Sequence, residues 1–219
     1  MNYEEVKQHY QENKDEIEER LKEFDEVGEL SDYRLFIELV FVILTSQTEA
    51  EKAWDAAEEL DDRNLLLEGN KQQIARVIER NEVQYEQNKA SYIVDNRELL
   101  CQPTLQNPTN ELKLKEKLDF SDLDKTREWL VDNIKGLGWK GASHFLRNIG
   151  HGDGIAIISS HIINQMNELE VVDSADAPSS KEDYLEMEER LKQFSQEIGI
   201  DIKALDLVLW SMKTGEVFK

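Results

Sequence analysis

Cysteine is almost absent from this chain of 219 residues, because Cys101 is the only one. A single cysteine excludes an internal disulfide and a multi-cysteine zinc site. The four histidines form no HExxH pattern, so no motif predicts a metal centre. No apolar run approaches the roughly 18 to 20 residues of a membrane-spanning helix, and the acidic N-terminus does not resemble a targeting peptide. The sequence therefore predicts a cytoplasmic protein with no membrane partner.

Basic residues are also scarce, at 26 Lys and Arg against 47 Asp and Glu, for a formal net charge of −21. Residues 1–62 carry 20 acidic side chains against 6 basic ones. Only residues 133–166 are nearly free of acids, with one aspartate and three bases. An acidic chain argues against non-specific binding of nucleic acid. A segment cleared of acids indicates, in contrast, that an anionic ligand docks there.

Proline and glycine number only 3 and 10, and apolar residues follow helical spacing along most of the chain. The pattern predicts an all-α fold of ten or so helices, with loops at 101–111 and 174–180. Thr48 is a candidate N-cap for the helix that follows it. The expected helices cover 3–27, 35–45, 50–60, 70–80, 86–100, 126–134, 141–150, a segment from near Ser159, 181–198 and 200–215.

The acid-free segment contains IKGLGWKGASHFL (134–146), which reads as a helix, a Gly-x-Gly turn and a second helix. Gly136 and Gly138 can adopt backbone angles that other residues avoid, and they leave backbone N–H groups exposed. The N-terminus of a helix carries partial positive charge and binds phosphate. A helix connection without a ligand is the alternative reading of a lone Gly-x-Gly.

The longer string IKGLGWKGASHFLRNIG resembles the helix-hairpin-helix of the DNA glycosylases, in particular the archaeal-type 8-oxoguanine DNA glycosylase/AP lyases. Three further stretches resemble other parts of that family: FVILTSQTEAEKAW (41–54), VQYEQNKASYIV (83–94) and LDLVLWSMKTGEVFK (205–219). The resemblance implies two helical subdomains around a base pocket. We expect an acidic N-terminal segment (1–34), a helical subdomain (35–125), and a hairpin segment with C-terminal helices (126–219) that forms one compact unit with 35–125.

The family resemblance also implies roles for single residues in the extrusion and excision of a damaged base. Lys140 matches the catalytic lysine, which attacks the sugar C1′ and forms a Schiff base. Such a lysine must be neutral, and both a helix N-terminus and burial lower the pKa of an ammonium group. Predicted to bind the base are Tyr85, Trp210 and Lys219, whose terminal carboxylate would accept the N7–H of 8-oxoguanine. Predicted to contact DNA are Gly136, Leu137, Gly138, Gln47 and His161.

The implied partner is double-stranded DNA that contains oxidised guanine, bound by a monomer. No cofactor is expected, apart from the option of a monovalent cation at the hairpin carbonyls. Trp139 receives no role.

The sequence departs from the family at AIISSHI (156–162), where Ser159 occupies the position of an aspartate. That carboxylate would stabilise positive charge on the sugar as the glycosidic bond breaks. Asp153 could replace it only if its turn folds back over Lys140. A serine can still cap the helix that follows, as aspartate would.

Three hypotheses follow from this departure. The leading one is an 8-oxoguanine DNA glycosylase with AP lyase activity, slowed by Ser159. The second is a DNA-damage binding protein of the same fold that has lost its chemistry. The third is a glycosylase for a different lesion.

Overall fold

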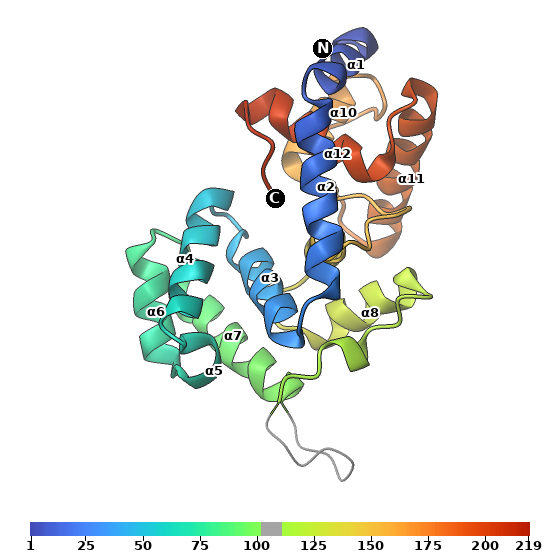
Figure 1. Cartoon of the computed structure of the whole chain (residues 1–219). Coiled ribbons are helices and arrows are strands. Elements are labelled where there is room, and N and C mark those ends of the chain that lie inside the picture. The colour runs from blue at the N-terminus through green and yellow to red at the C-terminus, as the bar shows by residue number, and fades with distance from the viewer. Residues whose placement is uncertain (102–110) are drawn as a thin grey trace. The chain divides into compact units, whose positions relative to one another are not determined.

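The computed structural model describes residues 1–101 and 111–219, so the predicted loop at 101–111 lies outside it except at its two ends. The described residues form helices and irregular connections without any strand, which confirms the all-α prediction (Figure 1). The helices are α1 (Tyr3–Glu12), α2 (Lys14–Glu29), α3 (Asp32–Leu44), α4 (Ala50–Asp62), α5 (Leu65–Glu68), α6 (Lys71–Arg80), α7 (Glu86–Leu100), the 3₁₀ helix η1 (Lys115–Lys117), α8 (Leu123–Asn133), α9 (Trp139–Asn148), α10 (Ser160–Glu168), α11 (Lys181–Ile198) and α12 (Ile202–Thr214). None of these helices is long and apolar enough to cross a membrane.

Two local predictions differ from the structure. The single helix expected over 3–27 is two helices, because Asn13 ends α1 and its side-chain amide donates to the His9 carbonyl at 2.9 Å. Asparagine side chains compete with the helical backbone in this way. Thr48 does not cap α4, whose N-cap is Glu49 without a side-chain bond. The Thr48 hydroxyl instead accepts the Gln84 N–H at 3.2 Å.

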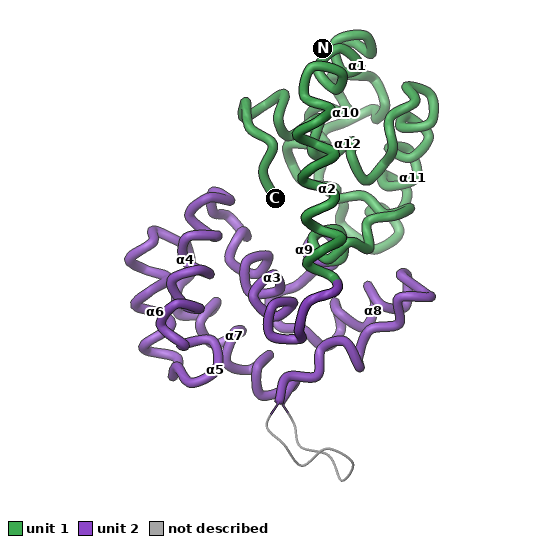
Figure 2. Tube along the Cα trace, in the orientation of Figure 1, with its two compact units in different colours: residues 1–28, 146–219 green, residues 29–145 purple. Residues whose placement is uncertain are grey.

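The chain divides into two compact units, drawn in different colours in Figure 2. Unit 1 combines residues 1–28 with 146–219, and unit 2 is the continuous stretch 29–145. The hydrophobic centre of unit 2 is α3, in which every residue from Leu35 to Leu44 is buried. Within this unit α3 packs on α4 and α7, and α7 packs on α5 and α6.

Unit 1 is organised around α12, which packs on α1, α10 and α11. Two backbone segments of this unit also pass in direct contact with each other. A Cβ atom added at Gly28, near the end of α2, would lie 2.4 Å from the Ile149 carbonyl oxygen. Glycine is therefore required where these two segments pass each other.

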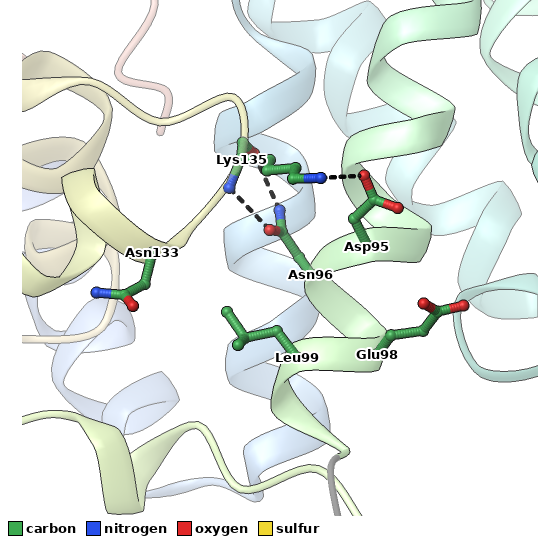
Figure 3. A pocket seen from close by; sticks show the side chains of 6 residues that line it. All are labelled: Asp95, Asn96, Glu98, Leu99, Asn133 and Lys135. Carbon is green, nitrogen blue, oxygen red and sulfur yellow. Dashed lines mark hydrogen bonds and ion pairs between the residues drawn. The ribbon is translucent and has the colours of Figure 1, made fainter.

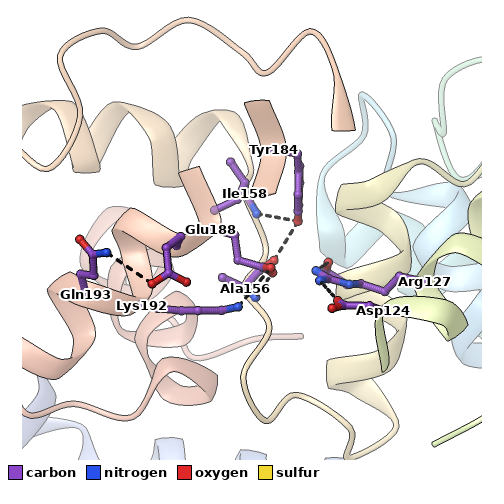
Figure 4. Close-up of polar contacts among 10 residues, drawn as sticks. Asp124, Arg127, Ala156, Ile158, Tyr184, Glu188, Lys192 and Gln193 are labelled. Carbon is purple, nitrogen blue, oxygen red and sulfur yellow. Dashed lines mark hydrogen bonds and ion pairs between the residues drawn. The ribbon is translucent and has the colours of Figure 1, made fainter. Parts of the chain in front are cut away.

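A buried irregular segment of unit 1 precedes α10. Residues 155–158 are all buried without being in a helix, so their backbone groups need other partners. Two side chains of α11 supply them, as Figure 4 shows. The Tyr184 hydroxyl donates to the Ala156 carbonyl at 2.8 Å and accepts the Ile158 N–H at 3.2 Å. The Glu188 carboxylate accepts the Ala156 N–H at 2.7 Å. These bonds hold the segment that immediately precedes Ser159.

Replacement of Tyr184 by phenylalanine tests this arrangement. The substitution leaves the Ala156 carbonyl and the Ile158 N–H without the hydroxyl, so the free energy of unfolding should fall by about 1–3 kcal/mol. Urea denaturation followed by circular dichroism measures it. The matched control is Tyr3→Phe, because the exposed Tyr3 contacts Phe194 through its ring and keeps that contact. Equal stability of the two variants would contradict the assigned role of Tyr184.

Candidate functional site

The hairpin, residues 135–138, connects α8 to α9 in unit 2. Gly136 has φ +86°, and a Cβ atom there would lie 2.7 Å from the Tyr92 ring and 3.3 Å from Ile43. Glycine is thus required at 136 by both conformation and space. Gly138 differs, since nothing lies within 4 Å of the position of its Cβ. The first N–H groups of α9 follow directly, and such groups have no acceptor within their own helix.

The hairpin is fixed to α7 by one buried amide. Asn96 accepts the Lys135 N–H at 2.8 Å and donates to the Lys135 carbonyl at 3.0 Å, and its residue exposure is 1%. The Lys135 ammonium pairs with Asp95 at 2.7 Å. Figure 3 shows these bonds at the wall of a cavity of about 290 Å³, lined also by Glu98, Leu99 and Asn133.

Lys140 lies in the first turn of α9, immediately after the hairpin. Burial lowers the pKa of its ammonium group, in the direction that the sequence argument required. A lower pKa increases the fraction of neutral amine near neutral pH, and only the neutral amine is a nucleophile. Trp139, left without a role by the sequence, lies against the Arg127 guanidinium, 5.2 Å from its ring centre.

A second buried amine, Lys89 on α7, was not predicted. Its ammonium group donates to the carbonyls of Leu44 and Ser46 at 2.9 and 2.7 Å and to the Thr48 hydroxyl at 3.2 Å. Burial, and then the nearby charge of Lys140, lower the pKa of Lys89 to about 8. The three acceptors all belong to the end of α3 and the turn after it, so this amine organises that turn.

Two strained residues meet beside Lys89. Gln47 and Tyr85 have φ of +54° and +60°, in the left-handed region that side-chain-bearing residues rarely adopt. The Tyr85 hydroxyl donates to the Gln47 side-chain oxygen at 2.9 Å. Both line a cavity of about 150 Å³, and Tyr85 is 52% exposed. The other residues around this cavity are Ile43, Ser46, Asn88, Lys89, Tyr92 and Gly136.

Unit 1 carries the other predicted site residues. Ser159 is the N-cap of α10 and accepts the Ile162 N–H at 3.3 Å, which confirms its predicted capping role. The exposed His161 ring lies edge-on to Trp210, with ring centres 5.3 Å apart. Lys219 is partly exposed at the end of the chain. Asp153, which the sequence suggested as a substitute for an aspartate expected at position 159, pairs with Lys203 of α12 at 3.1 Å.

The structure thus brings predicted residues together in two sets. In unit 2 the hairpin precedes Lys140, and Gln47 contacts Tyr85. In unit 1 His161 contacts Trp210 and Ser159 begins the same helix as His161. The catalytic and binding roles of these residues stay predictions.

Sequence reasoning missed Lys89 and Asn96. Residues 86–100 show only weak helical spacing of apolar residues, because two of the buried positions on this helix are the polar residues Lys89 and Asn96. That weak spacing was the signal available in the sequence.

Comparisons with known proteins agree on one family. Residues 17–200 match the family described as Ogg-HhH, 8-oxoguanine DNA glycosylase. An 8-oxoguanine DNA glycosylase/AP lyase of Fusobacterium nucleatum is 34% identical to this chain, covering 99% of it and 97% of the relative. The corresponding protein of Methanocaldococcus jannaschii is 33% identical and covers 94% of this chain and 93% of its own length.

Solved structures give the same result. The 8-oxoguanine DNA glycosylase of Thermotoga maritima matches with a TM-score of 0.87 at 33% identity, covering 99% of this chain and 98% of the other. The M. jannaschii 8-oxoguanine glycosylase/lyase in complex with a 15mer DNA containing 8-oxoguanine matches with a TM-score of 0.86 at 31% identity, covering 99% of each chain.

Titration of the lysines tests the electrostatics of unit 2. Lys89 should lose its proton with a midpoint near 8, and Lys140 below the ordinary value of 10.5, because burial disfavours the charged amine. Lys52, which lies at the surface, should titrate above 10.5, because Glu82 and Glu49 stabilise its charge. The ¹³Cε shifts of labelled lysine measure all three, and Lys89→Met identifies the first signal. A Lys89 midpoint at 10.5 would show that this amine is not buried in solution.

Proposed function

Because the chain belongs to the 8-oxoguanine DNA glycosylase family, we propose that it excises 8-oxoguanine from DNA and cleaves the resulting abasic strand, with Lys140 as nucleophile. The sequence resemblance, the helix-hairpin-helix glycosylase fold and the glycosylase/AP lyase class are confirmed by the relatives. The observation that carries the residue assignment is the lowered pKa of a lysine placed directly after a Gly-x-Gly hairpin.

The chemistry needs a neutral amine and a leaving base. The Nζ lone pair of Lys140 forms a bond to C1′, while the electrons of the glycosidic bond leave with the base, which takes up a proton. Loss of an amine proton and opening of the sugar ring give a Schiff base. Removal of a C2′ proton then expels the 3′ phosphate by β-elimination, and water releases the enzyme.

The hairpin supports DNA binding. The amides around Gly136, Leu137 and Gly138 lead into the N-terminus of α9, where partial positive charge favours a phosphate. Gly138 has open space at its Cβ position, so folding does not require glycine there, whereas close approach of a ligand backbone would. A monovalent cation at the hairpin carbonyls belongs to the same proposal.

Tyr85, Trp210 and Lys219 are proposed to bind the damaged base. Tyr85 offers an exposed aromatic face, and the half-buried Trp210 offers a second aromatic ring beside His161. The carboxylate of Lys219 would accept the N7–H that distinguishes 8-oxoguanine from guanine. Gln47 and His161 would contact the DNA around the extruded nucleotide. One monomer, acting on chromosomal DNA inside the cell, suffices for this scheme.

Ser159 sets the expected rate. A serine dipole stabilises positive charge on the sugar less than a carboxylate does, and Asp153 is already paired with Lys203. We therefore expect slow turnover rather than altered folding, since Ser159 caps α10 as aspartate would.

Borohydride trapping on a duplex with one 8-oxoguanine tests the nucleophile. Wild-type protein should give a covalent complex, and Lys140→Gln should give none, because glutamine cannot form a Schiff base. Lys125→Gln is the matched control, since this exposed lysine pairs with Asp122 at the start of its own helix. Binding to the lesion without trapping by the wild type would identify a damage-binding protein instead.

Restoration of the carboxylate tests the cause of slow turnover. Ser159→Asp should raise the single-turnover excision rate by roughly 10²-fold or more. The control is Ser180→Asp, because Ser180 is likewise an N-cap, accepting the Asp183 N–H at 3.0 Å. Both variants should melt close to the wild type. An unchanged rate in Ser159→Asp would show that the missing carboxylate does not limit the reaction.

A further inference from the structure

The buried face of α7 carries two polar side chains where a helix normally places apolar ones. Lys89 and Asn96 are 3% and 1% exposed. They are seven residues apart, so they point from the same side of the helix, about 10 Å apart along its axis. A buried cation and a buried amide are both costly unless fully hydrogen-bonded. Their joint presence therefore needs an explanation beyond filling space.

Lys89 determines the geometry of the Gln47 turn, residues 45–48. All three of its hydrogen bonds go to the last turn of α3 and to this turn. The turn contains Gln47 in a left-handed conformation, and Gln47 accepts from Tyr85 next to the start of α7. A strained residue persists only where its surroundings over-determine it. The ammonium group of Lys89 and the Gln84 N–H to Thr48 provide that restraint.

Asn96 restrains the geometry of the hairpin as Lys89 restrains that of the Gln47 turn. Its amide forms a two-bond pair with the backbone of Lys135, the first hairpin residue. Between the two tethers, the Tyr92 ring on α7 lies directly under Gly136, as the 2.7 Å approach to a Cβ at that position shows. One helix thus holds the Gln47 turn at one point and the hairpin at two.

We propose that Lys89 and Asn96 are positioning residues that fix the Gln47 turn and the hairpin at one spacing along α7, so that the two DNA-contacting loops act as a single rigid template. The inference rests on the proposed function, because it assigns DNA contacts to both loops. Neither side chain touches the reacting atoms. Asn96 acts through the hairpin on phosphate binding, and Lys89 acts through Gln47 and Tyr85 on the extruded nucleotide.

Substitution of Asn96 and substitution of Lys89 should affect DNA affinity and excision differently. A general loss of structure would instead lower both in the two variants. Asn96→Leu should weaken the binding of damaged and undamaged duplex alike, by about 10-fold. It should also reduce the slope of log K against log salt by about 1, as expected for one lost phosphate contact. Lys89→Met should leave the affinity for undamaged duplex within about twofold. Its single-turnover excision should fall by about 10²-fold, the scale of a small misplacement.

The experiment uses the full chain and four variants. Affinity is measured by anisotropy at several salt concentrations, base extrusion by 2-aminopurine fluorescence beside the lesion, and excision by single-turnover kinetics. Lys71→Met and Gln72→Leu are the matched controls, because both residues are exposed on α6 and lie outside the Gln47 turn and the hairpin. Both should behave as the wild type does in every measurement.

Two conservative variants keep the inference testable if Lys89→Met or Asn96→Leu does not fold. Lys89→Arg retains a buried cation with several donors and should recover most of the extrusion signal. Asn96→Asp retains the acceptor for the Lys135 N–H and loses the donor, so it should weaken both duplexes by less than Asn96→Leu. Parallel loss of binding, extrusion and stability in all four α7 variants would overturn the inference. An inactive wild type would instead overturn the proposed function.

Discussion

A buried ammonium group has to donate its hydrogen bonds to protein oxygens, and Lys89 meets this requirement with three oxygens from the end of α3 and the turn after it. The same turn connects α3 to α4, and the Thr48 hydroxyl within it also accepts a hydrogen bond from the Gln84 N–H. The α3–α4 connection and the α6–α7 connection are therefore joined beside the buried ammonium group of Lys89, and Lys52 links them a second time through Glu49 and Glu82. The position of Gln47 and Tyr85 depends on this junction.

Folding and catalysis make different demands on position 159. For the start of α10, the requirement is a short oxygen-bearing side chain, which serine and aspartate both supply. Under the proposed mechanism, bond cleavage requires negative charge near the developing positive charge of the sugar. The bonds from Tyr184 and Glu188 hold the preceding segment whichever residue occupies 159. The cap and these bonds therefore do not require a carboxylate at 159, whereas the proposed chemistry does.

The sequence alone predicted most of the helices, the hairpin and the cap at Ser159, because each is determined by local spacing or by one residue type. It did not predict the short helices α5 and η1. It failed at Asn13 and Thr48, where a side chain chooses between its own helix and a distant partner. It could not identify Lys89 or Asn96, since their partners lie 39 to 45 residues away in the sequence. Gln47 and Tyr85, which both adopt left-handed conformations, likewise bond to each other across 38 residues of sequence.

The assembly of unit 1 from both ends of the chain has a consequence during synthesis. Residues 29–145 are continuous and can fold as they emerge, whereas α1 packs on α12, and His9 bonds to Ser211 at 2.8 Å. At translation rates of roughly 5–20 residues per second, α1 waits about 10–40 s for that partner. The acidic surplus of the first helices keeps a segment without its core soluble during this delay. Like charge of this kind disfavours association of unfolded segments, so the acidic N-terminus suits a segment that must wait for its partner.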